Sequence, residues 1–150
     1  MGEGSVEILI VEDNAADVFL TYTALRDAKI TNAIKVVTDG EEALAYLRRE
    51  GKYANAVRPD IIFLDLNLPM MNGHEVLAVI KADPNLRAIP VVMVSGSNAE
   101  SDIAQAYDEQ VAAYIVKPAT HDEYVRAFRA VKELWFHIVV LPPKHAGSGT

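Results

Sequence analysis

The fold is indicated by the stretch Ile61-Ile62-Phe63-Leu64-Asp65, in which consecutive apolar residues end in an acid. Two similar stretches stand elsewhere in the chain, each an apolar run followed at once by charge: Ile8-Leu9-Ile10-Val11-Glu12-Asp13 and Tyr114-Ile115-Val116-Lys117. Such runs are typical of parallel strands that are buried on both faces. Ligands bind at the carboxyl ends of strands in open α/β sheets. These charged residues therefore mark the candidate site.

Helical patterns separate the apolar runs, so that strand and helix alternate five times along the chain. The expected strands are residues 6–11, 34–38, 61–64, 91–94 and 113–116, and the expected helices are residues 15–28, 41–49, 74–82, 99–109 and a last one that follows Thr120. Asn14 is expected to cap the first helix, and Ser97 or Asn98 the fourth. Thr120 and Glu123 have the spacing of a capping box. The alternation predicts an α/β fold, a doubly wound parallel sheet with helices on both faces.

The helical spacing also predicts which side chains face the core. These inward residues are Val18, Tyr22 and Leu25 in the first helix, Ala43, Leu44 and Leu47 in the second, and Tyr124, Phe128, Val131 and Trp135 in the last.

Composition excludes several classes of protein. The chain has 150 residues, of which 51% are hydrophobic, and is expected to form one domain with a full core. It has no cysteine, which excludes disulfides, zinc–thiolate sites and cysteine nucleophiles. The formal net charge of -7 and the scattered basic residues argue against direct nucleic-acid binding. No apolar stretch approaches the roughly 20 residues of a membrane span, and no signal peptide is visible. We therefore expect a cytoplasmic protein.

Three acids at neighbouring strand ends predict a cation site. Glu12, Asp13 and Asp65 would repel one another if they lay in one layer, and a hard divalent cation removes that conflict. Mg²⁺ is the natural choice, because it takes oxygen ligands and often binds together with phosphate. We expect Asp13 and Asp65 as direct ligands, Glu12 acting through water, and the backbone carbonyl of Asn67 completing the set.

The same strand ends offer groups that suit a phosphoryl group. With a cation beside it, Asp65 can act as a nucleophile and form an acyl phosphate. Charge that develops on the phosphoryl oxygens needs positive partners. Lys117 supplies an ammonium group and Ser95 a hydroxyl donor, while Gly96 leaves room for close backbone approach. Taken alone, each residue has a simpler interpretation, as a solvated loop acid, a helix cap or a surface lysine. Their joint placement at the strand ends favours a phosphoryl-binding site.

This set of residues resembles the response-regulator receiver domain of two-component signalling. The matching residues are Glu12-Asp13, the segment Leu64-Asp65-Leu66-Asn67-Leu68-Pro69 with Gly73, then Ser95 and Lys117-Pro118. The resemblance implies a flavodoxin-like sheet of strand order 2-1-3-4-5. It also implies phosphotransfer from a histidine kinase to Asp65, with Mg²⁺ as cofactor and Mn²⁺ or Ca²⁺ as substitutes. It further implies a cis peptide before Pro118 and a switch aromatic at Tyr114.

Two further features narrow the resemblance. The loop at residues 52–59 and the ending at residues 134–142 are similar to the stand-alone regulators that are paired with bacterial and cyanobacterial phytochromes. A phytochrome-type kinase is therefore the expected partner. Because no output domain is visible, we expect the signal to reach an unknown downstream protein by contact or by phosphorelay.

The apolar ending suggests a homodimer. Its expected interface residues are Trp135, Phe136, Ile138, Val139, Val140 and Leu141. An apolar run that the core does not need usually marks an interface, and the alternative is that the run folds back on its own domain. The expected division of the chain is a flexible tail at 1–5, the receiver domain at 6–136, a dimerising extension at 137–144 and a disordered tail at 145–150.

Two rival functions remain open from the sequence. A phosphatase of the haloacid-dehalogenase type also uses an aspartyl nucleophile with Mg²⁺, but it needs a carboxylate where this chain has Asn67. A pseudo-receiver would keep the fold and never accept phosphate. We expect a phosphoacceptor, not an enzyme, with slow intrinsic autodephosphorylation. The resemblance implies that the second residue after the acceptor and the second after the hydroxyl, here Asn67 and Ser97, tune the access of water. Both are small and polar, so we expect the phosphoryl group to be lost in less than many hours.

Overall fold

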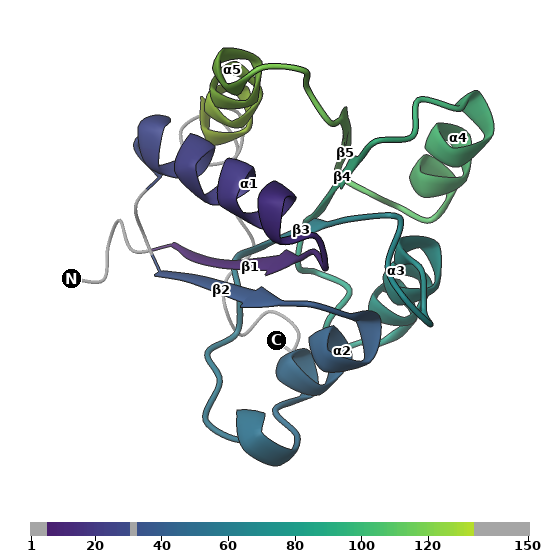
Figure 1. The fold of residues 1–150 in the computed structure, drawn as a ribbon. Coiled ribbons are helices and arrows are strands. Elements are labelled where there is room, and N and C mark those ends of the chain that lie inside the picture. Colours follow the sequence, from purple (N-terminus) through teal and green to yellow (C-terminus); the bar gives the residue numbers. More distant parts are fainter. Residues whose placement is uncertain (1–5, 31–32, 134–150) are drawn as a thin grey trace.

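Strands and helices alternate along the chain in the computed structural model, which describes residues 6–30 and 33–133 (Figure 1). The strands are β1 (Glu7–Val11), β2 (Ala33–Val37), β3 (Ile61–Leu64), β4 (Val91–Ser95) and β5 (Ala113–Val116). The helices are α1 (Ala15–Asp27), α2 (Gly40–Arg48), α3 (Gly73–Ala82), α4 (Glu100–Asp108) and α5 (His121–Lys132), with a short 3₁₀ helix, η1, at Gly51–Tyr53. The parallel strands lie in the order β2-β1-β3-β4-β5, so the predicted fold class is confirmed.

The register of the central strands brings the polar strand ends together. Val11, the last residue of β1, pairs with Leu64 of β3. The backbone N–H of Asp65 then donates to the carbonyl of Val11 at 3.0 Å, which carries the ladder one residue further. Glu12 and Asp65 therefore leave the sheet side by side, as the apolar runs predicted.

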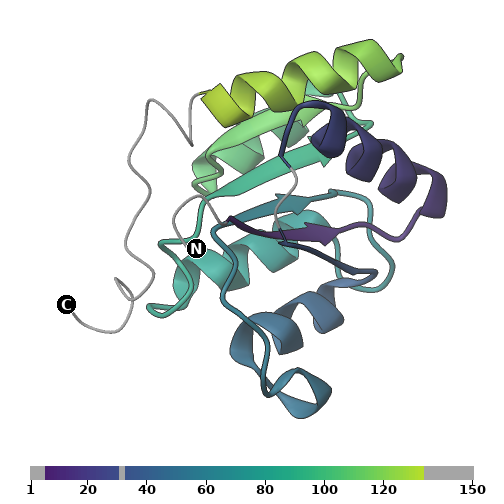
Figure 2. The same ribbon diagram turned by 90° about the vertical axis from the view of Figure 1, so that its left-hand side faces the viewer.

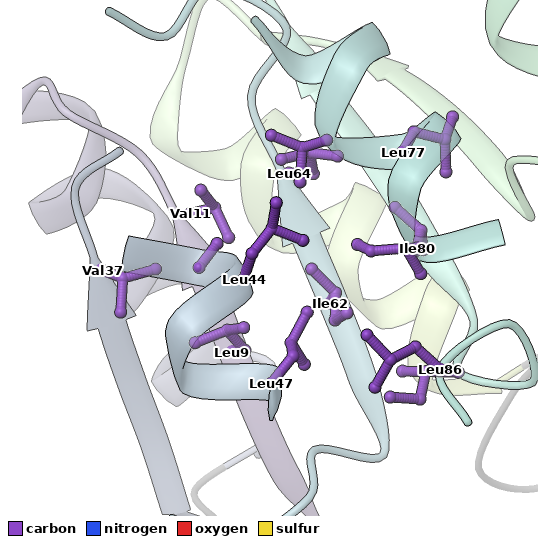
Figure 3. Close-up of a cluster of buried hydrophobic side chains, with 14 of the residues drawn as sticks. Leu9, Val11, Val37, Leu44, Leu47, Ile62, Leu64, Leu77, Ile80 and Leu86 are labelled. Atoms are coloured by element: carbon purple, nitrogen blue, oxygen red, sulfur yellow. The ribbon is translucent and has the colours of Figure 1, made fainter. Parts of the chain in front are cut away.

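Helices cover both faces of the sheet and enclose two separate cores. Helices α1 and α5 lie together on one face, whereas α2, α3 and α4 lie on the other, and the two views agree on this arrangement (Figures 1 and 2). On the α5 side, the rings of Phe63 and Phe128 meet edge to face at 5.0 Å between centroids. Figure 3 shows the opposite core, where side chains from α2, α3 and alternate strand positions interdigitate. Each fully buried side chain of this size contributes roughly 1.5–3 kcal/mol.

The inward face of α1 differs from the prediction. Leu25 is buried as expected, but the other buried positions are Thr21 and Ala24, and Tyr22 is 47% exposed. Phe19 is also exposed. Small side chains on the inner face let α1 lie close to the sheet, which leaves the larger rings outside. The predicted inward residues of α2 are buried, as are Tyr124, Phe128 and Val131 of α5.

Two local predictions at the strand–helix junctions are wrong. The N-cap of α4 is Ala99, which makes no side-chain capping bond, and not Ser97 or Asn98. The described residues contain no cis peptide bond, so the bond before Pro118 is trans. The trans form is the more stable form of an X-Pro bond by about 0.5–1 kcal/mol, and the Lys117 side chain reaches the acidic cluster with it.

Several predictions fall outside the described residues. They are the tails at 1–5 and 145–150, the extension at 137–144, and the interface residues Trp135, Phe136, Ile138, Val139, Val140 and Leu141. Within residues 6–30 and 33–133, no helix has the length and apolar character that crossing a membrane requires.

Candidate functional site at the strand ends

Three carboxylates converge beyond the ends of β1 and β3. One oxygen from each of Glu12, Asp13 and Asp65 lies within 4.8 Å of the other two. Glu12 and Asp65 are only 5% and 4% exposed, whereas Asp13 faces solvent. Hard oxygen donors at this spacing fit a divalent cation such as Mg²⁺ or Mn²⁺, with Asp13 on the side from which an ion can enter.

The burial of Glu12 has an electrostatic cost. Burial raises the pKa of its carboxyl to about 7, although hydrogen bonds from Lys117 and from the backbone N–H of Asn14 act in the opposite direction. The nearby charge of Asp65 adds to the rise. A cation bound in this cluster would relieve the same conflict, because it stabilises the ionised form of each acid. The donor set therefore fits a metal on its charge as well as on its geometry.

Lys117 is the positive group of the site. Its Nζ lies 2.9 Å from Glu12 Oε1, 2.7 Å from Asp17 Oδ2 and 3.5 Å from Asp65 Oδ2. Burial alone would lower the pKa of the ammonium group, but hydrogen bonds to Asp17 and Glu12 outweigh burial and raise it above the ordinary value. The backbone N–H of Lys117 donates to the Ser95 carbonyl at 2.7 Å, which fixes the end of β5 beside β4. Lys117 is thus a fixed, permanently charged group beside Asp65.

Ser95 and Gly96 end β4 next to this cluster. Ser95 is fully buried, and its Oγ accepts a hydrogen bond from the backbone N–H of Ser97 at 3.2 Å. A β-carbon at Gly96 would meet no atom within 4 Å, so the space beside the backbone there is open. This openness is what the approach of a ligand to the backbone needs.

The loop after Asp65 is held against the start of α3. Asn72 and Glu75 form a reciprocal capping box there. Gly73 donates its N–H to the Leu66 carbonyl at 2.7 Å. The backbone N–H of Asn67 donates to Asp65 Oδ1 at 3.3 Å, and the Asn67 side chain is exposed. The role of the Asn67 carbonyl as a cation ligand stays a prediction.

Tyr114 connects β5 to the loop after β4. Its hydroxyl donates to the Ser97 carbonyl at 2.9 Å, and its partly buried ring packs against the α2–α3–α4 core. The residue therefore contacts the backbone segment that begins with Ser95. This is the position from which an aromatic ring can respond to movement of that segment.

Two groups of polar residues beside the site were not predicted. Asp17, in the first turn of α1, accepts a hydrogen bond from Lys117 across 100 residues of sequence. His74 of α3 is buried, with Nδ1 2.8 Å from Oε1 of Glu109, the C-cap of α4, and Nε2 3.6 Å from Oδ1 of Asp102 in α4. Asp102 in turn accepts from Ser97 Oγ at 2.5 Å. No local spacing in the sequence marks either group.

Comparison with known proteins relates the chain to one family. Residues 8–129 match the model of the response regulator receiver domain. The chain is 38% identical over 135 residues to response regulator Rcp1 of Synechocystis sp., covering 90% of this chain and 92% of that protein.

Solved structures agree with this assignment. The phosphorylated cyanobacterial phytochrome response regulator RcpA superposes with a TM-score of 0.86 at 47% identity, covering 93% of this chain and 99% of that one. The Mn²⁺-bound form of Rcp1 superposes with a TM-score of 0.84 at 37% identity, covering 92% of this chain and 99% of that one. The acidic cluster described above thus lies in a chain that is similar to a metal-binding relative.

Proposed function

The chain belongs to the response regulator receiver domain family, and from this we propose that Asp65 accepts a phosphoryl group from a histidine kinase in a Mg²⁺-dependent reaction. The observation that carries the proposal is the placement of Asp65. Its carboxylate is buried just after the end of β3, clustered with the carboxylates of Glu12 and Asp13 and 3.5 Å from Lys117 Nζ.

The phosphoryl group passes from the kinase to Asp65 in a single displacement step. An Asp65 oxygen forms a bond to phosphorus while the bond from phosphorus to the kinase histidine nitrogen breaks, and the electron pair leaves with that nitrogen. A bound Mg²⁺ would neutralise charge on the transferred oxygens. Lys117 supplies positive charge to them. The Ser95 hydroxyl can donate to a phosphoryl oxygen once its segment moves, and Tyr114 would follow through its bond to the Ser97 carbonyl.

A phytochrome-type kinase is the proposed donor, and its support is the similarity of this chain to Rcp1 and to the phytochrome response regulator RcpA. We place the reaction in the cytoplasm, where a histidine kinase would present its phosphohistidine. The phosphorylated domain would then signal by protein contact or phosphorelay. The homodimer remains a prediction that sedimentation of the full chain against a chain ending at Phe136 can test.

The phosphoacceptor role has a direct test. Purified protein is incubated with phosphoramidate and Mg²⁺, and intact-mass measurement follows formation of the acyl phosphate. We expect wild type to be phosphorylated, Asp65→Asn to be unreactive, and chelation of the metal to abolish the reaction. A wild type that stays unmodified would make the protein a pseudo-receiver. Sustained hydrolysis of p-nitrophenyl phosphate would instead favour the haloacid-dehalogenase type of enzyme, which the proposal does not expect.

A further inference from the structure

Asp17 is the carboxylate nearest to the Lys117 ammonium group, yet it has no role in the proposed phosphotransfer. It lies in the first turn of α1, where its backbone N–H donates to the capping side chain of Asn14 at 2.9 Å. Its carboxylate reaches Lys117 Nζ at 2.7 Å, and 27% of the side chain is exposed. The Asp17 oxygen therefore lies 0.8 Å nearer to the ammonium group than Asp65 does, since the Asp65 distance is 3.5 Å.

Two carboxylates hold Lys117 by close contacts, Asp17 at 2.7 Å and Glu12 at 2.9 Å. An ammonium group has three N–H donors, and three carboxylates surround it: Asp17, Glu12 and Asp65. A phosphoryl oxygen on Asp65 must draw the ammonium group towards itself against the two closer carboxylates, Asp17 and Glu12. Glu12 belongs to the acidic cluster and Asp65 carries the phosphoryl group itself, whereas Asp17 is outside that cluster. Asp17 is therefore the acid that competes with the phosphoryl oxygens for Lys117.

We propose that Asp17 is a positioning residue that holds Lys117 away from the phosphoryl group and so restrains phosphorylation of Asp65. The inference rests on the proposed phosphoacceptor function. Asp17 touches neither the phosphorus nor the acceptor oxygen; it acts through Lys117. Releasing Lys117 gives the transferred oxygens a full ammonium partner and removes one negative charge near them. Both effects favour the transition state and the acyl phosphate.

Phosphoramidate is the probe for the first test. Its phosphorus–nitrogen bond breaks as the bond from Asp65 to phosphorus forms, and the nitrogen leaves as ammonia with the electron pair. In Asp17→Asn the initial rate should rise about threefold to tenfold over wild type, the scale of one ionic hydrogen bond in a partly exposed site. Glu41→Gln removes an exposed acid from the first turn of α2, on the other face of the sheet, and should leave the rate unchanged.

A second pair of variants separates action through Lys117 from general repulsion. In a Lys117→Met background, Asp17→Asn should give no acceleration, because the group on which Asp17 acts is gone. Binding of beryllofluoride, a stable mimic of the phosphoryl group, provides the same comparison at equilibrium if the variant rates are too slow to measure. Asp17→Asn should bind it tighter only when Lys117 is present.

Each result bears on the proposal. An unchanged rate in Asp17→Asn would mean that Asp17 only stabilises the contact between α1 and the end of β5. A slower rate would mean that Asp17 positions Lys117 for catalysis. Either result overturns the inference. Acceleration that persists with Lys117→Met also overturns it. If wild type accepts no phosphoryl group and binds no beryllofluoride, the proposed function itself has failed, and that outcome is distinct from all of these.

Discussion

Gly73 packs against the backbone of Asp65 so closely that a β-carbon at position 73 would lie 2.4 Å from the Asp65 carbonyl oxygen and 2.7 Å from the α-carbon of Leu66. Both neighbours are backbone atoms, which cannot rotate away. The start of α3 is therefore fixed against the backbone of the acceptor residue. Glycine is required here because no β-carbon fits in the space, and not because of its backbone angles.

Gly73→Ala should destabilise the protein by about 1–3 kcal/mol, since the added methyl group forces the Asp65 segment and α3 apart. Chemical denaturation would measure the change in the free energy of unfolding. Gly96→Ala is the matched control, because a β-carbon there meets nothing within 4 Å. We expect the control to change stability by less than about 0.5 kcal/mol. Equal losses in the two variants would contradict the packing explanation.

Divalent cations should stabilise the folded protein through the acidic cluster. A ligand that binds only the native state adds about 2.7 kcal/mol at a hundredfold excess over its dissociation constant. We expect the melting temperature to rise with Mg²⁺ or Mn²⁺ concentration and to fall back with chelator. Asp13→Asn, which removes the exposed member of the cluster, should lose most of this rise. Glu41→Gln should retain it. A cation effect of equal size in Asp13→Asn would place the ion elsewhere.

The bond from the Tyr53 hydroxyl to Glu42 should make stability depend on pH. This hydrogen bond is the main cause that holds the pKa of Glu42 below its ordinary value of 4.5. A lowered pKa in the folded state contributes stability above the unfolded value, and that contribution is lost as pH falls through the folded value. Tyr53→Phe should therefore cost about 1–2 kcal/mol near pH 7 and much less in acid.

Tyr46→Phe is the control for this pH effect. The Tyr46 ring packs edge to face on the Tyr53 ring at 5.2 Å between centroids, so both variants keep the aromatic pair. Only Tyr53→Phe removes the bond to Glu42. Urea denaturation of the three proteins from pH 3 to pH 7 would compare them. A loss in Tyr53→Phe that is constant over this range would exclude the linkage to Glu42.

The phosphoryl group on Asp65 should be lost within minutes to a few hours. Asn67 is exposed and Ser97 is half-buried, so neither side chain closes the approach of water. Asn67→Met should lengthen the half-life several-fold by covering that approach, whereas Met70→Leu, in the same loop, should leave it unchanged. Decay of the acyl phosphate by intact mass provides the measurement. A wild-type half-life of many hours would show that the route is closed.

The fold could be predicted because the sheet leaves a local signal in the sequence. Runs such as Ile61–Leu64 and Val91–Val94 are apolar at every position, as strands buried on both faces require. The strand ends, and with them Asp65, follow from the same runs. The inner face of α1 was predicted less well. Leu25 packs inward as its helical spacing predicts, but Tyr22 does not, and the small side chains of Thr21 and Ala24 pack inward instead. Close packing depends on side-chain size as well as on polarity.

The rest of the site depends on contacts that no local pattern encodes. Asp17 meets Lys117 only because α1 and the end of β5 lie together in space, 100 residues apart in the chain. His74 meets Glu109 through the packing of α3 on α4, across 35 residues. Nothing in the sequence distinguishes Asp17 or Glu109 from other acids of a helix. The trans bond before Pro118 was missed for a different reason, since the family resemblance implied the other isomer.

The two separate cores have a consequence for how such a protein can diverge. The apolar side chains around Phe128 pack on one face of the sheet, and those around Leu77 pack on the other. The strands between them are the shared layer, and the reactive groups leave that layer at its edge. A lineage can therefore accumulate substitutions on the outward sides of the helices of one face, away from contacts such as Asp17 to Lys117 and Gly73 to Asp65. It can so acquire a new binding partner while the opposite face and the reacting groups are inherited unchanged.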